Sequence, residues 1–145
     1  MANKIISFRD LEVYQKAYRL SIVVMTKIVP RLPESEKYDL KDQLSRSSKA
    51  IPRLIAEGYA KKHQRLGFQK YLDDAMAETN ETIVSLSQSS DIYKIEIDLS
   101  NKLIKEYDIL ARQIFCLSES WSNFKYKKRR KDPKTKPINH TGCQN

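Results

Sequence analysis

Two basic segments of the sequence carry residue types that bind nucleic acids. Residues 124–131 read FKYKKRRK, with Phe124 and Tyr126 interleaved among the cations. Phosphates attract Lys and Arg, and aromatic rings stack on unpaired bases. This composition favours RNA or DNA over an acidic protein partner or a simple solubility tail. The residues of this segment that we predict to bind nucleic acid are Lys125, Tyr126, Lys127, Lys128, Arg129, Arg130 and Lys131.

The second basic segment is KKHQR at residues 61–65. We expect it in the turn between two helices, where Lys61, Lys62 and Arg65 form a patch that binds phosphates. The same cations also lie where a helix ends, and complementing the negative end of that helix explains them equally well. A multimer would repeat both basic segments and so multiply weak affinities.

Little in the sequence points to catalysis. No HExxH motif, paired Cys motif, phosphate-binding glycine loop or nucleophile elbow occurs. Asp73, Asp74 and Glu78 fall on one predicted helix, where a solvated acidic face is a better explanation than a metal site. We therefore expect no enzymatic activity, no metal and no other cofactor. A metal-assisted nuclease that uses these acidic residues is the least favoured alternative.

The net charge of +9 is distributed unevenly along the chain. Residues 125–145 hold eight Lys or Arg against one Asp, whereas residues 1–124 hold nineteen basic and seventeen acidic residues. The basicity therefore belongs to the C-terminal end, and residues 1–124 are nearly neutral. We expect residues 125–145 to form a flexible basic tail that is disordered without a partner.

The length of 145 residues predicts one domain in residues 1–124. Cys116 and Cys143 make neither a disulfide framework nor a metal motif, as expected of thiols in a reducing compartment. The first residues contain no apolar run typical of a signal peptide, and no stretch is long and apolar enough for a membrane span. We expect a cytoplasmic protein with no membrane partner.

Apolar residues recur at spacings of three and four in four segments, at about residues 8–29, 35–62, 66–90 and 99–124. Short connections between such segments predict an all-α, antiparallel up-down-up-down four-helix bundle. The first segment carries two neighbouring apolar stripes, which indicates either a deeply packed helix or contact with another subunit. We expect Asp98 to cap the fourth helix.

Residues 45–62 combine a helical pattern with Pro52, Glu57 and Gly58. Proline removes a helical hydrogen bond, which predicts a kink near residues 48–52, and Gly58 allows another element to come close. Glu57 is expected near the bundle interior, where a carboxylate needs polar partners. A structural network that fixes the helix register is a better explanation than catalysis, and its predicted members are Gln43, Arg46, Arg53, Glu57 and Glu81.

The sequence also resembles a known family. The resemblance covers about residues 8–120 and rests on FRDLEVYQKA at 8–17, PRLPESEKYDL at 30–40, Gln43, Arg46, AIPRLIAEG at 50–58, and Phe68, Leu72, Ala75 and Glu81. These residues are similar to the four-helix-bundle proteins encoded in intervening sequences of large-subunit ribosomal RNA genes. The accessory variability proteins of diversity-generating retroelements are related to them.

The resemblance implies a ring-shaped homopentamer with one bundle per subunit. It also implies basic surfaces that bind nucleic acid and, in retroelements, a reverse transcriptase with its template RNA as the partner. With the basic segments, it predicts a non-catalytic RNA- or DNA-binding accessory protein that assists a reverse transcriptase. The alternative is an intervening-sequence protein that acts as a scaffold for protein assembly.

Overall fold

The computed structural model describes residues 4–129, with the backbone alone for residues 123–129. Its long helices are α1 (Glu12–Val23), α2 (Leu40–Ala60), α3 (Gly67–Tyr93) and α4 (Ile97–Arg129). No strand occurs in the described residues, so this part of the chain is all-α, as predicted. Shorter helical segments are Phe8–Asp10, Val24–Ile28, Val29–Arg31 and Glu34–Glu36.

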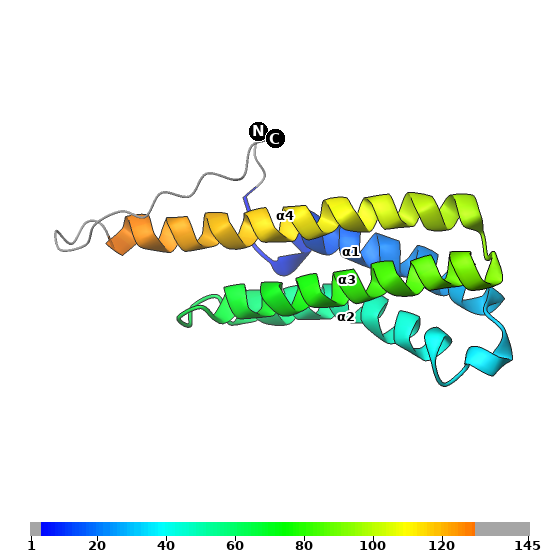
Figure 1. Ribbon diagram of the computed structural model, residues 1–145. Helices are drawn as coiled ribbons and strands as arrows, with labels where there is room; N and C mark the ends of the chain where they lie inside the picture. Colours follow the sequence, from blue (N-terminus) through cyan, green and yellow to red (C-terminus); the bar gives the residue numbers. More distant parts are fainter. Residues whose placement is uncertain (1–3, 130–145) are drawn as a thin grey trace.

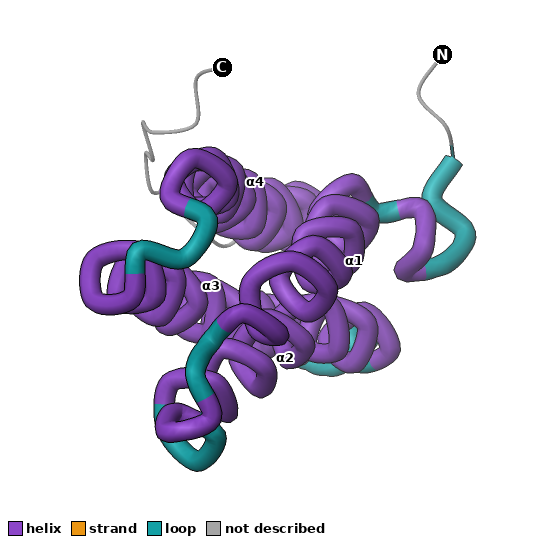
Figure 2. Tube along the Cα trace, turned by 90° about the vertical axis from the view of Figure 1, so that its right-hand side faces the viewer, coloured by secondary structure: helices purple, strands orange, loops and turns teal. Residues whose placement is uncertain are grey.

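The four long helices pack around one core and run alternately in opposite directions (Figure 1). Viewed along their axes, they occupy four corners, with α1 and α3 each lying between α2 and α4 (Figure 2). A salt bridge of 3.0 Å between Lys16 Nζ and Glu106 Oε2 also joins α1 to α4. The largest fully buried side chains include Ile28, Leu44, Ile51, Phe68, Leu72, Leu86, Tyr107 and Ile114.

The first predicted helix is divided in the structure. A short helical turn at Phe8–Asp10 precedes α1, and Leu11 between them has an extended backbone. A wider helical turn at Val24–Ile28 continues α1 until Pro30 and Pro33 enter the chain. Proline lacks the backbone N–H that a helix needs, so α1 cannot run on into α2.

Pro52 lies inside α2 and is buried. The first turns of α2 stand at an angle to the rest of the helix, as the cyan part of Figure 1 shows. The bend lies before Pro52, where the carbonyl of Ser48 loses its usual donor. The hydroxyl of Ser48 donates to the Ser45 carbonyl at 3.4 Å, and Ser47 accepts a bond of 2.9 Å from Thr82 on α3.

The connection between α3 and α4 is shorter than the predicted gap at residues 91–98. The amides of Lys94 and Ile95 donate to the carbonyls of Ser90 and Ser89, at 3.0 and 3.3 Å, and these bonds close α3. Asp98 was predicted as the cap of the fourth helix, but it lies within the first turn of α4. Its carboxylate there is still well placed for the positive end of the helix dipole.

Helix α4 continues beyond residue 124, where we placed the start of a flexible tail, and reaches Arg129. No glycine or proline stands between Trp121 and Pro133, and Lys and Arg are good helix formers. The apolar periodicity of this helix ends at Phe124, although the helix itself continues. The rest of the predicted tail, residues 130–145, lies outside the described residues.

Candidate nucleic-acid interface

The turn between α2 and α3 presents the basic residues predicted from KKHQR. The amides of Lys61, Gln64 and Gly67 donate to the carbonyls of Gly58, Lys61 and Gln64, so the turn is held by its own backbone. The side chains of Lys61, His63 and Arg65 are exposed, and that of Lys62 is half-buried. We call Lys61, Lys62 and Arg65 the turn patch.

Two glycines fix how closely the turn and its helices pack. A Cβ atom on Gly67 would lie 2.2 Å from the carbonyl oxygen of Lys61, and a Cβ on Gly58 would lie 2.5 Å from the Cβ of Tyr71. Both distances are shorter than atoms tolerate, so neither position accepts a side chain without a shift of the backbone. The glycines therefore set the position of the turn patch on the bundle.

Each lysine of the turn patch contacts a tyrosine. Lys61 Nζ lies 5.0 Å from the ring centroid of Tyr71 and donates a 2.8 Å hydrogen bond to its hydroxyl. This bond raises the pKa of Lys61 above its ordinary value. Lys62 Nζ lies 4.0 Å from the ring centroid of Tyr59, and both tyrosines are half-buried. The turn thus combines cations with aromatic rings, which sequence reasoning recognised only at residues 124–131.

The last part of α4 lies beside the start of α3. The rings of Phe68 and Trp121 meet edge to face with centroids 5.0 Å apart, and Gln69 Nε2 lies 3.5 Å from Ser122 Oγ. The α2–α3 turn and the C-terminal end of α4 lie at the same end of the bundle, on the left in Figure 1. The structure therefore brings together two basic segments that lie about sixty residues apart in the sequence.

Five predicted nucleic-acid-binding residues of the segment 124–131 belong to the last turns of α4 by their backbone: Lys125, Tyr126, Lys127, Lys128 and Arg129. Arg130 and Lys131 lie outside the described residues. We call residues 124–129 the α4 basic end.

The predicted polar network is not buried. Glu57 is exposed, because the buried stripe of α2 passes through Ile51, Ile55 and Gly58 and leaves Glu57 on the solvent side. The other four predicted members, Gln43, Arg46, Arg53 and Glu81, line one groove of about 520 Å³ together with Ser47, Lys49, Ala50 and Glu78. Arg46 forms a 3.4 Å salt bridge with Asp42 one turn earlier on α2. These four residues thus form part of a surface groove between α2 and α3.

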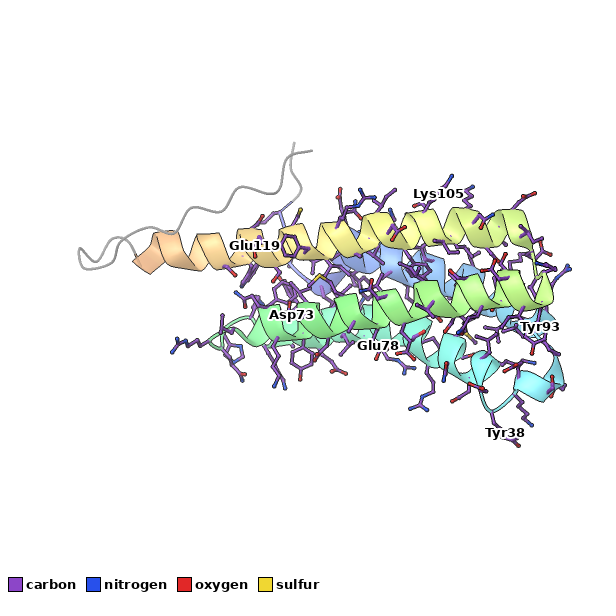
Figure 3. All side chains as sticks on the ribbon, viewed as in Figure 1. Tyr38, Asp73, Glu78, Tyr93, Lys105 and Glu119 are labelled. Carbon is purple, nitrogen blue, oxygen red and sulfur yellow. The ribbon has the colours of Figure 1, made fainter. Side chains whose placement is uncertain are left out.

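Glu78 also lines this groove, although the predicted network did not include it, and the pKa of its carboxyl is shifted. Burial, followed by the neighbouring Glu81 carboxylate, raises the pKa of Glu78, while Arg46 lowers it. Asp73 and Glu78 follow one another along α3 (Figure 3). The spacing of Glu78 and Glu81, three residues apart on a helix, was a signal for this pairing. Within the part of the chain that the structure describes, no three His, Cys, Asp or Glu side chains could together hold a metal ion.

The model of the 23S rRNA-intervening sequence protein family matches residues 9–116. The chain belongs to this family. No curated protein and no solved structure matches the chain significantly. The match to the intervening-sequence family includes the turn patch and the groove between α2 and α3, whereas Trp121 and the α4 basic end lie beyond it.

This member of the intervening-sequence family also has an apolar groove along α1 and α2, of about 340 Å³. It is lined by Phe8, Tyr14, Tyr18, Ser21, Ile22, Met25, Lys49, Pro52, Arg53 and Ala56. Tyr18 and Ile22 are 53% and 47% exposed, so the first helix presents apolar side chains to solvent at this groove. Among the described helices, none is both long and apolar enough to cross a membrane.

Proposed function

We propose that this intervening-sequence family protein binds RNA or DNA without catalysing a reaction on it. The observation that carries the proposal is that the turn patch and the α4 basic end lie at one end of the bundle. Cations from both segments can then contact phosphates of the same strand, and each contact releases counterions from the nucleic acid. The side chains that the structure describes include no arrangement that reads base edges in a groove, and we expect binding to depend weakly on sequence.

We further propose that the chain assembles into a homo-oligomer. The apolar groove along α1 and α2 supports contact with a second copy, since exposed apolar surface of this kind marks interaction sites. The resemblance implies a ring of five subunits, which would present five copies of the basic end and raise the overall affinity. In this arrangement the protein would hold structured nucleic acid beside a reverse transcriptase as an accessory factor.

The experiment measures binding of the full chain to labelled RNA and DNA at increasing salt, with the mass determined by light scattering. The proposal predicts affinity that falls steeply with salt and a mass several times that of one chain. Absence of binding to both nucleic acids at moderate salt would refute the proposal. Monomeric mass with salt-sensitive binding would refute only the assembly.

The second candidate is a scaffold that assembles protein partners, and the apolar groove is the observation that favours it. Lys49 and Arg53 lie at the groove, so the partner of such a scaffold would be an acidic protein. In the same assay the scaffold would bind neither RNA nor DNA. A metal-assisted nuclease remains the third candidate. It would require cleavage that depends on a divalent cation and is lost in the Asp74→Ala variant.

A further inference from the structure

The two tyrosines beside the turn patch indicate which form of nucleic acid it binds. Tyr59 lies in the last turn of α2 and Tyr71 in the second turn of α3, so one ring stands on each side of the turn. Each ring is half-buried and has a lysine ammonium close to it, 4.0 Å from the ring centroid of Tyr59 and 5.0 Å from that of Tyr71. The Lys62 ammonium occupies a position that a base stacked on Tyr59 would take, whereas Lys61 lies at the hydroxyl edge of Tyr71.

The two rings are held in place by packing. Tyr59 meets the ring of Phe68 edge to face with centroids 5.9 Å apart, and Phe68 in turn packs against Trp121. Tyr71 is held close to α2 because its Cβ lies where a side chain on Gly58 would be. The rings are therefore positioned by the bundle itself, whereas the lysine side chains over them are long and have many rotamers.

The cations and rings can exchange partners. An ammonium group over an exposed ring gains less than a base stacked on that ring, and the same ammonium gains more from a phosphate than from the ring. A strand with unpaired bases offers both partners at once. A duplex offers phosphates but keeps its bases stacked inside, so only the cations of the turn patch would be used.

We propose that the α2–α3 turn binds single-stranded nucleic acid, with unpaired bases stacked on Tyr59 and Tyr71 and phosphates bound by Lys61 and Lys62. This inference rests on the proposed function and adds that the nucleic acid bound at the turn is single-stranded. The site distinguishes unpaired from paired bases but does not distinguish one base from another, because every base has a face that can stack.

The test compares three labelled probes on the full chain: oligo(dT), an abasic strand with the same number of phosphates, and a DNA duplex. The inference predicts that the wild-type protein binds oligo(dT) about tenfold more tightly than the abasic strand. A Tyr59→Leu, Tyr71→Leu double variant is expected to remove most of that difference, while the ratio between the affinities for the abasic strand and the duplex stays unchanged. Thermal unfolding of each variant checks that the bundle is intact.

Conservative variants separate stacking from a merely structural role. Tyr71→Phe and Tyr59→Phe keep the rings and should retain the preference for oligo(dT), although Tyr71→Phe loses the hydrogen bond to Lys61. If Tyr59→Phe and Tyr71→Phe instead abolish the preference for oligo(dT) over the abasic strand, the rings do not stack on bases and the inference is wrong. Equal wild-type affinity for oligo(dT) and the abasic strand also overturns it, while the proposed function stands. Failure to bind any probe overturns both.

Discussion

Trp121 on α4 packs edge to face against Phe68 on α3, with the ring centroids 5.0 Å apart. Phe68 is fully buried and begins the helix that follows the turn patch, whereas Trp121 lies three residues before the α4 basic end. This contact is thus one of those that hold the C-terminal part of α4 beside the start of α3. It places Trp121, which lies beyond the family match, among the residues that build the proposed interface.

Trp121→Ala should therefore affect both stability and binding. Removing a half-buried indole that packs on Phe68 is expected to lower the free energy of unfolding by about 2 kcal/mol. Affinity for nucleic acid should also fall, because the end of α4 is no longer held beside the turn. Trp121→Phe keeps an edge-to-face contact and serves as the control. Binding that is unchanged in a folded Trp121→Ala variant would show that the contact does not position the interface.

Gly58→Ala should destabilise the bundle. Its Cβ would lie 2.5 Å from the Cβ of Tyr71, which cannot move without shifting α3, so the loss is expected to be about 1–3 kcal/mol in denaturant unfolding. Glu57→Ala, one residue earlier and exposed, is the matched control and should change stability by less than about 0.5 kcal/mol. A larger loss of unfolding free energy for Glu57→Ala than for Gly58→Ala would contradict this expectation and support the buried network that the sequence predicted.

Lys94→Gly should stabilise the protein. Lys94 has a φ of 54°, the left-handed conformation in which a Cβ is unfavourable, and it closes α3 at the position where glycine is preferred. The gain is expected to be about 1 kcal/mol. Lys102→Gly removes the same charge inside α4 and should cost a similar amount, since glycine disfavours a helix interior. The opposite order of the two melting temperatures would contradict this account.

The contact between Tyr93 and Glu36 should make stability depend on pH. The Tyr93 hydroxyl donates to Glu36, and this bond, followed by the bond from the Leu40 amide, lowers the pKa of the Glu36 carboxyl below its ordinary value of 4.5. A lowered pKa in the folded state stabilises the protein at pH values above 4.5, and the contribution is lost as the pH falls through the lower value.

Tyr93→Phe is expected to remove part of this contribution. The difference in unfolding free energy between wild type and variant should be constant near neutral pH and shrink as the pH falls below the ordinary value for Glu36. Tyr38→Phe is the control, because Tyr38 is 88% exposed and should show no such dependence. A difference that grows in acid would mean that the bond is not made to the carboxylate.

The helices of this protein were predictable because their apolar spacing is regular and the prolines at residues 30 and 33 interrupt it. The sequence did not reveal that α4 continues to Arg129, since periodicity ends where apolar residues end although nothing there breaks a helix. Asp98 was wrongly predicted as the helix cap because the turn before α4 ends earlier than expected. Lys94 and Glu96 adopt positive φ values in that turn, and the sequence does not indicate this because neither residue is glycine.

The candidate interface was predicted as two separate segments. Their meeting at one end follows from the packing of α4 along α3, which includes the Phe68–Trp121 contact between residues far apart in the sequence. The tyrosines at 59 and 71 were missed because each is spaced like a core residue, and only the structure places lysines over their rings. Glu57 was wrongly expected in the interior because one residue separates it from the buried stripe, and one position on a helix turns a side chain by about 100°.

We propose that the turn patch and the α4 basic end bind nucleic acid through phosphate contacts. The most direct test measures affinity for single-stranded RNA against salt for the full chain and for a Lys61→Ala, Lys62→Ala, Arg65→Ala triple variant. A second triple variant, Lys27→Ala, Lys102→Ala, Lys105→Ala, removes the same charge from other exposed positions, with Lys105 on the outer side of α4 (Figure 3). We predict that the Lys61, Lys62 and Arg65 variant makes the negative slope of log affinity against log salt shallower by about 2. The control variant should change this slope little. Equal slopes for all three proteins, or an equal loss in both variants, would contradict the claim.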